Sequence, residues 1–188
     1  MSRKRVAGDT LTGGTKDVNP QFLTVRVTQT GADTATTGSF GVPIQRVGPN
    51  TQGKAIIMEV LKAFFNMPTN GVIGAAGETI DSVSAFWSTV DFGTTGTSWS
   101  EPRVFAGCQR QRVGAFTAAG TFADTEENGL IMQDLTDGAG HGILVATDNV
   151  FMQVISANGL TNQVDCKLLY RWKEVSLIEY IGIVQSQQ

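Results

Sequence analysis

Short stretches of alternating apolar and polar residues, separated by Gly, Asp and Asn turns, recur along most of the chain and most constrain its fold. In residues 22–29, Leu23, Val25 and Val27 would face one way and the polar residues between them the other. Residues 163–173 alternate in the same manner. A period of two is typical of strands with one buried face. The pattern therefore predicts an all-β protein.

We expect about eight to ten short strands, a number that favours an antiparallel sandwich or barrel. Pro43 predicts an edge or bulged strand over 40–47, because proline cannot donate to the ladder. Loops are expected at 30–38 and 94–100, and residues 177–184 form a last apolar segment. The expected strands are 22–29, 40–47, 55–65, 82–91, 103–105, 113–117, 130–135, 143–146, 150–155 and 163–173.

Residues 55–65 fit two periods, and their apolarity alone does not separate strand from helix. A helical stripe would hold Ile56, Val60 and Ala63. The all-β context favours a strand instead. One face of that strand would carry Ile57, Glu59, Leu61, Ala63 and Phe65.

Composition narrows the fold class further. The 188 residues suffice for one domain with a sizeable core. Only 16% are charged, against about 25% in typical soluble domains. This argues against a coiled coil, a helical bundle or a disordered tail. We expect an antiparallel two-sheet jelly-roll sandwich first and an immunoglobulin-like sandwich second, since the Cys-Trp-Cys pattern of the latter is missing.

Charge is distributed unevenly along the chain. The first sixteen residues hold four bases and one acid, whereas the remainder holds ten bases and sixteen acids. We divide the chain into an N-terminal arm, 1–20, and a jelly-roll shell domain, 21–188. A basic arm on an acidic body suits contact with nucleic acid once many copies converge. The candidate nucleic-acid-binding residues are Arg3, Lys4, Arg5 and Lys16.

A second basic group, Arg103, Arg110 and Arg112, lies near Glu101. Two interpretations stay open for it: a salt-bridged surface, or a subunit interface or inner surface that meets phosphate. The two cysteines, Cys108 and Cys166, form no metal-binding pair and are expected to be reduced and buried.

No motif reaches a catalytic constellation. Residues 48–54 imitate a phosphate-binding loop, but Ala55 lacks the hydroxyl that would hold magnesium. Residues 124–135 begin like a calcium loop, yet Leu135 replaces the bidentate Glu, which leaves weak surface calcium binding open. His141 is the single histidine, too few for a zinc site. We expect no enzyme activity, no cofactor and no membrane insertion.

Several segments together resemble the small capsid proteins of environmental viruses with circular single-stranded DNA genomes. The resemblance extends over most of the chain after residue 16. It is carried by residues 17–21 (DVNPQ), 57–62 (IMEVLK), 137–145 (DGAGHGILV), 170–175 (YRWKEV) and 179–187 (EYIGIVQSQ). Family members often carry a longer arginine-rich arm, whereas here only Arg3, Lys4 and Arg5 stand at the start.

The resemblance implies a single jelly-roll coat protein that assembles into an icosahedral shell around nucleic acid, with single-stranded DNA as the expected cargo. Its partners would be many copies of itself, the viral genome and a host receptor. Its location would be the virion, after synthesis in the host cytosol. The alternative is a β-sandwich module that binds carbohydrate or a receptor, with Trp99 as a better stacking platform than Trp87. A phosphate-loop enzyme is the third hypothesis.

Overall fold

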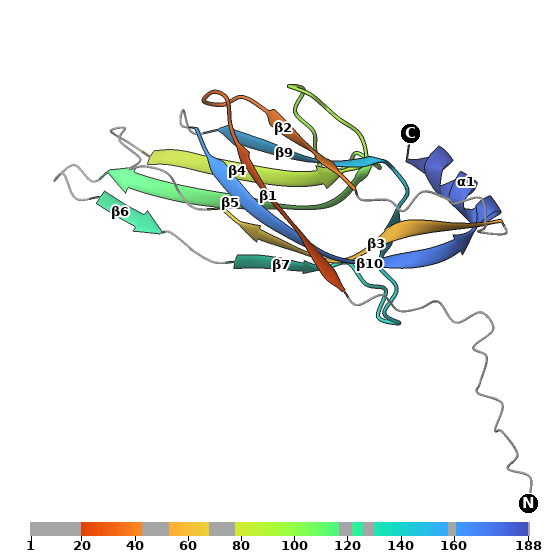
Figure 1. The fold of residues 1–188 in the computed structure, drawn as a ribbon. Helices are drawn as coiled ribbons and strands as arrows, with labels where there is room; N and C mark the ends of the chain where they lie inside the picture. The colour runs from red at the N-terminus through yellow and green to blue at the C-terminus, as the bar shows by residue number, and fades with distance from the viewer. Residues whose placement is uncertain are drawn as a thin grey trace, which may run out of the picture.

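Ten β-strands and one α-helix form the described part of the computed structural model (Figure 1). The structure describes residues 20–42, 53–67, 78–116, 122–125, 130–157 and 161–187. Within these ranges, the side chains of 78–81, 112–116 and 122–125 are left out of the description. Most of the predicted arm, 1–20, therefore lies outside the described residues, and the division into arm and shell domain stays a prediction.

The strands form two antiparallel five-stranded sheets. Sheet A has the order β1-β10-β3-β7, and β8 pairs with β3 beyond the end of β7. Sheet B has the order β2-β9-β4-β5-β6. Sheet A consists of β1 (Gln21–Thr28), β10 (Gln163–Ser176), β3 (Lys54–Asn66), β7 (Leu130–Asp134) and β8 (Ile143–Val145). Sheet B consists of β2 (Thr36–Gly41), β9 (Asn149–Ala157), β4 (Glu78–Ser88), β5 (Val104–Phe116) and β6 (Phe122–Thr125).

The pairing pattern describes one long hairpin that is rolled up. The first half of the chain meets the second half strand by strand: β1 with β10, β2 with β9, β3 with β7 and β8, and β4 with β5. The pairs β10–β3 and β9–β4 then join neighbouring arms of the hairpin into sheets. This is a jelly roll, and it confirms the predicted fold class.

The inner faces of the two sheets enclose the main core. Its largest fully buried side chains include Trp87, Phe65, Met58, Met152 and Leu168. The Trp87 indole N–H donates to the Cys166 sulfur at 3.2 Å, so the ring is both packed and satisfied. Trp87 is thus a core residue and no ligand platform. Both cysteines are buried and free, as expected.

A β-bulge in β3 explains why residues 55–65 fitted two periods. The register with β10 shifts between Leu169 and Tyr170, whose partners are Lys62 and Val60, and Leu61 is the extra residue. Before the bulge, Met58 and Val60 enter the main core; after it, Ala63 and Phe65 do. The strand prediction was right. The single face that we predicted was wrong, since Ile57 and Glu59 lie on the outer face of sheet A and Ala63 and Phe65 on the inner face.

Several elements differ from the sequence prediction. β2 begins at Thr36, inside the predicted loop. The segments 103–105 and 113–117 were predicted as separate strands, but residues 104–116 form the continuous β5, because β4 supplies a ladder along its whole length. Residues 177–184 belong to the helix α1 (Leu177–Ser186), where Ser176 accepts from the Glu179 N–H at 3.2 Å as an N-cap.

Helix α1 covers one end of the outer face of sheet A. Tyr180, Ile183 and Val184 pack there on a second, smaller cluster. That cluster consists of Ala55, Ile57, Ala146 and Val175. The end of the helix is fastened by Gln187, whose amide accepts from the Ala146 N–H at 3.0 Å and donates to the Leu144 carbonyl. The helix is therefore a fixed part of the surface.

Candidate interaction surfaces

The four candidate nucleic-acid-binding residues, Arg3, Lys4, Arg5 and Lys16, lie outside the described residues. Their role therefore stays a prediction.

The second basic group extends from Arg103, just before β5, along that strand, and it does not form one cluster. Arg103 and Arg110 are seven extended residues apart, about 23 Å along the strand. Arg103 binds Glu101 at 2.6 Å and lies over the Phe92 ring at 5.4 Å. It braces the loop before β5, and its hydrogen bond lowers the pKa of Glu101.

Arg110 lies farther along β5, where the neighbouring Gln109 and Gln111 are exposed. It shares the inward face with Cys108 and donates to the Met67 carbonyl at the end of β3. Arg110 thus joins sheet B to the end of a sheet A strand, which is a structural role. The Arg112 side chain is not among those described. The assignment of these arginines to a subunit interface or inner surface stays a prediction.

Sequence analysis missed a buried charge cluster on the outer face of sheet A. Glu59 is 0% exposed. Its carboxylate accepts from Arg171 Nε at 2.5 Å, from Lys173 Nζ at 3.2 Å and from the Gly142 N–H at 3.0 Å. Arg171 also donates to the Gly140 carbonyl at 3.1 Å. Two sequence features point to this cluster. Glu59 interrupts an apolar run, and Arg171 and Lys173 alternate along the strand that pairs with it in sheet A.

This cluster is a structural device. Burial alone would raise the pKa of Glu59, but the hydrogen bonds from Arg171, Gly142 and Lys173 outweigh burial, and the pKa is lowered. The glycine-rich turn 136–142 lies over this cluster and is held there by the hydrogen bond from the Gly142 N–H to Glu59. A Cβ at Gly142 would lie 2.1 Å from the Val60 carbonyl oxygen, so only glycine lets the turn approach β3 this closely.

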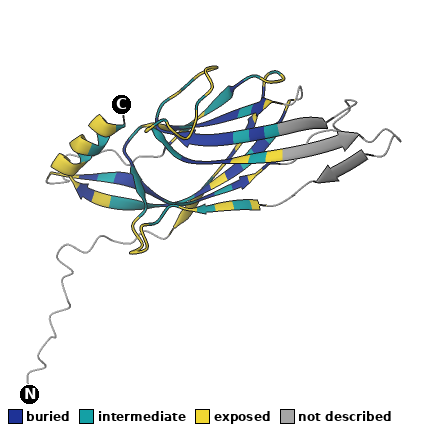
Figure 2. Cartoon of the chain, turned by 180° about the vertical axis from the view of Figure 1, so that it is seen from behind, coloured by how far each residue is buried: buried dark blue, intermediate teal, exposed yellow. Residues whose placement is uncertain are grey.

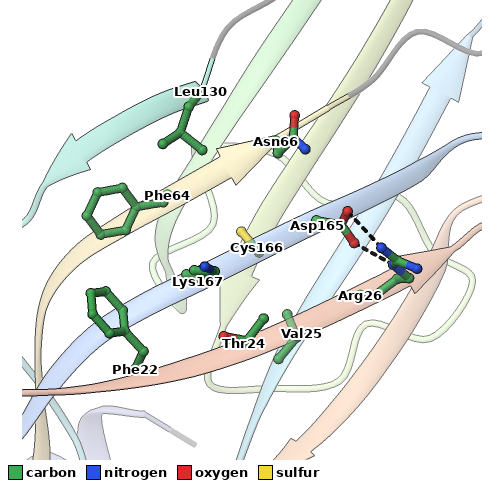
Figure 3. A pocket seen from close by; sticks show the side chains of 10 residues that line it. All are labelled: Phe22, Thr24, Val25, Arg26, Phe64, Asn66, Leu130, Asp165, Cys166 and Lys167. Atoms are coloured by element: carbon green, nitrogen blue, oxygen red, sulfur yellow. Dashed lines mark hydrogen bonds and ion pairs between the residues drawn. The ribbon is translucent and has the colours of Figure 1, made fainter.

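Beyond the cluster, the outer face of sheet A is open and hollowed (Figure 3). A cavity of about 830 Å³ lies over β1, β10, β3 and β7. Phe22 and Phe64 lie together at one end of it, with ring centroids 6.2 Å apart. An ion pair between Arg26 and Asp165, at 2.5 Å, borders it. Its lining consists of Phe22, Thr24, Val25, Arg26, Phe64, Asn66, Leu130, Asp165, Cys166 and Lys167.

The walls of this hollow are unusually apolar for a surface. Leu130 is 65% exposed and Phe22 is 59% exposed. Just outside the lining, Met132 is also exposed and pairs with Phe64 in the β3–β7 ladder. We call Phe22, Phe64, Leu130 and Met132 the apolar groove. Contiguous exposed apolar surface marks interaction sites.

Helix α1 has an exposed side, yellow in Figure 2, and this side carries a second group of exposed apolar side chains. The inward side of the helix packs on sheet A. Leu177, Ile178 and Ile181 are exposed to solvent, and Ile178 is 85% exposed. We call these three residues the helix edge.

On the opposite side of the molecule, a loop lies over the outer face of sheet B. Buried Gln153 holds it: its amide nitrogen donates to the Gly93 and Thr95 carbonyls, and its oxygen accepts from the Thr97 N–H at 2.9 Å. The same loop carries Trp99, half exposed and edge-on to Phe86 at 5.7 Å. Trp99 therefore remains accessible to a ligand, in contrast to Trp87.

The motif-like segments have ordinary structural roles where the structure describes them. Lys54 and Ala55 begin a strand, whereas a phosphate-binding loop leads into a helix. His141 pairs with Asp137 at 3.1 Å on an exposed turn. Within the described ranges, no group of three His, Cys, Asp or Glu residues is arranged to hold a metal, and no helix is long and apolar enough to cross a membrane.

Comparisons with known proteins give structural matches only. No protein-family model matches the chain, and no curated protein matches its sequence. VP1 of Human Polyomavirus 7, solved as a pentamer, superposes with a TM-score of 0.51 at 8% identity. The match covers 85% of this chain and 98% of that one. VP1 of Trichodysplasia spinulosa-associated polyomavirus, solved in complex with GM1 oligosaccharide, gives a TM-score of 0.49 at 9% identity, covering 82% and 95% of the two chains.

This chain shares the jelly-roll fold of a viral capsid protein. Identity this low shows the fold alone. The resemblance to capsid proteins of single-stranded DNA viruses is neither matched nor overturned by these comparisons, since the structural neighbours are polyomavirus VP1 proteins.

Proposed function

We propose that this chain is a viral coat protein that assembles into an icosahedral shell around nucleic acid. The jelly roll shared with a pentamer-forming VP1 is the observation that carries the proposal. The apolar groove and the helix edge give it physical support, because both are apolar surfaces that assembly would cover. Single-stranded DNA as cargo and the virion as location belong to the same proposal.

The chemistry of the outer faces fits a structural role. The described charged side chains on sheet A are mostly engaged in pairs, such as Arg26 with Asp165 and Lys62 with Asp134. Glu59 is enclosed by two cations and a backbone N–H, so its carboxylate is occupied in holding strands and a turn together. Self-assembly needs no catalytic group. These contacts make sheet A a rigid part of the proposed shell subunit.

The test is the particle formed by the full chain. The purified protein is examined by light scattering and negative-stain microscopy at low and high salt. We expect uniform hollow spheres of megadalton mass. A protein that stays a monomer or trimer under all conditions would overturn the proposal. Nucleic acid extracted from the particles is then digested with DNase or RNase, and loss to DNase alone identifies DNA as the cargo.

A second candidate function, glycan or receptor binding, is favoured by one observation. Trp99 is half exposed on a loop that Gln153 fastens, and a fixed aromatic ring is a suitable stacking platform for a sugar. A glycan array probed with the wild-type chain and with Trp99→Ala tests it. Binding that disappears in the variant while particle formation persists would support both functions in one chain. No binding to any glycan would remove this candidate.

A further inference from the structure

Two apolar surfaces at opposite ends of the same sheet together hold most of the large apolar side chains that are exposed in the described residues. Of the seven large apolar side chains that are exposed in the described residues, six belong to the apolar groove or the helix edge. Trp99, on the other sheet, is the seventh. One surface is hollow, and the other is a protruding helix fastened at its end.

We propose that the helix edge of one copy docks in the apolar groove of another copy. The inference rests on the proposed coat-protein function, and it names the contact through which copies first associate. Leu177, Ile178 and Ile181 supply the apolar side chains, and Phe22, Phe64, Leu130 and Met132 receive them. A ten-residue helix is about 15 Å long, which is the scale of a hollow that spans four strands about 4.8 Å apart.

Charge complementarity supports this choice of occupant. Glu179 is the single charged residue of α1 and is exposed beside the helix edge. Lys167 is exposed in the lining of the groove, on β10 between Phe64 and Thr24 of the neighbouring strands. Docking would bring the carboxylate of Glu179 toward the ammonium of Lys167. A pair of opposite charges across an apolar contact sets its orientation and its rate of association.

The helix cannot fill the groove of its own chain. α1 packs over Ala55, Ile57 and Val175, at the end of β10. Lys167 lies eight residues earlier on that strand, about 26 Å away along it. The turn over Glu59 occupies the sheet between the two places. The contact must therefore join two molecules, and because its two sides differ it can build a ring or, if repeated reciprocally, a two-fold pair.

Variants that each carry one added cysteine test which surfaces meet. Ile178→Cys and Met132→Cys are made in the full chain, where the native thiols are buried, and each is oxidised alone and as an equimolar mixture. We expect a cross-linked dimer in the mixture and little in either variant alone. Cross-links that form as readily in Ile178→Cys alone would show that helix meets helix, and would overturn the proposal.

Charge exchange gives an independent test. Glu179→Lys and Lys167→Glu should each weaken association by about tenfold or more, and the double variant should recover most of the loss. Sedimentation across a concentration series provides the measurement. Equal weakening in the single and double variants would mean that the two groups do not meet.

Apolar-to-acidic substitutions connect the contact to shell formation. Ile178→Glu and Met132→Glu alter exposed side chains, so both variants should fold, with circular dichroism as the check, yet form no particles. Trp99→Glu is the matched control and should assemble normally. Particles from Met132→Glu would overturn the docking proposal and leave the coat-protein function intact. If the wild-type chain forms no particles but the two cysteine variants cross-link as a mixture, the shell is overturned and the contact is retained.

Discussion

At the scale of single residues, Glu59 shows how a charge can be buried without disturbing a sheet. Its carboxylate receives two cationic side chains and one backbone N–H, and its side chain is 0% exposed. Removing one partner of such a group leaves the others uncompensated. The network therefore stabilises the fold only while it is complete.

Glu59→Ala should lower the free energy of unfolding by about 3–5 kcal/mol, the usual range for breaking a buried ion pair. Urea unfolding monitored by tryptophan fluorescence measures the change. Glu174→Ala is the control: Glu174 pairs with Lys54 at the exposed end of the same two strands, so its loss should change stability little. Equal effects of the two substitutions would contradict the structural role of the buried cluster.

The lowered pKa of Glu59 predicts a pH dependence with a defined sign. The folded state binds the proton of Glu59 more weakly than the unfolded state, whose glutamate pKa is about 4.3. The stabilisation is therefore fully present above that value and is lost as pH falls toward the lower folded pKa. The stability difference between wild type and Glu59→Gln should shrink below about pH 4.3. A difference that stays constant down to pH 3 would contradict the assignment.

Gly142 and Gly182 form a matched pair for the same substitution. Gly142→Ala places a Cβ against the Val60 carbonyl, which forces the turn off β3 and should cost about 1–3 kcal/mol. Gly182→Ala meets open space on α1 and should stabilise the protein by about 0.5–1 kcal/mol. Thermal unfolding of both variants gives the comparison, and a stable Gly142→Ala would show that the turn is not held closely.

At the scale of elements, sequence patterns located most strands but not their faces or their continuity. β1 follows the predicted alternation, and so does β10 from Gln163 to Trp172, because there one face of each strand meets the main core. β3 changes face at the Leu61 bulge, which depends on pairing with β10 and leaves no local mark. β5 continues through Gly107 and the polar residues after it, because β4 provides a ladder that propensity does not reveal.

The same limit applies to the interaction surfaces. The groove combines residues from β1, β3, β7 and β10, which are up to about 150 positions apart, so only the sheet order brings them together. The helix edge could be anticipated as a late apolar segment, although its helical form depends on the Ser176 cap.

Gln153 makes the loop over sheet B an element-level test. Gln153→Ala removes the acceptor of the Thr97 N–H and the donor to Gly93 and Thr95, while β9 keeps its ladder. We expect a loss of about 1–3 kcal/mol in stability and faster amide exchange in residues 92–97. Exchange that is unchanged in this loop would show that Gln153 does not hold it. Gln109→Ala, on the same outer face, is the control.

At the scale of the whole molecule, the jelly roll provides two different outer faces. Sheet B is partly covered by its own loop, and sheet A is covered by α1 at one end and left open at the other. The proposed shell subunit would need this asymmetry, since a surface covered everywhere would have nothing to bind, and one exposed everywhere would aggregate without order.

Replacing Arg3, Lys4, Arg5 and Lys16 with Ala should leave particle formation intact and lower the nucleic acid that purifies with the particles. The physical reason is that each chain loses four positive charges that, under the proposed function, would lie close to the nucleic acid. The ratio of absorbance at 260 and 280 nm of purified particles measures the cargo. Lys54→Ala, a change to a paired base on the body, is the control. Undiminished cargo would assign packaging to another surface.

The central position of β10 in sheet A also determines when a growing chain can become competent to associate. β10 lies between β1 and β3, so those strands have no shared neighbour until residues 163–176 leave the ribosome. The groove takes Lys167 from this strand, and the helix edge follows directly after it. Both surfaces thus form only after this part of the chain has been made, which would delay the proposed contact between nascent chains on one messenger.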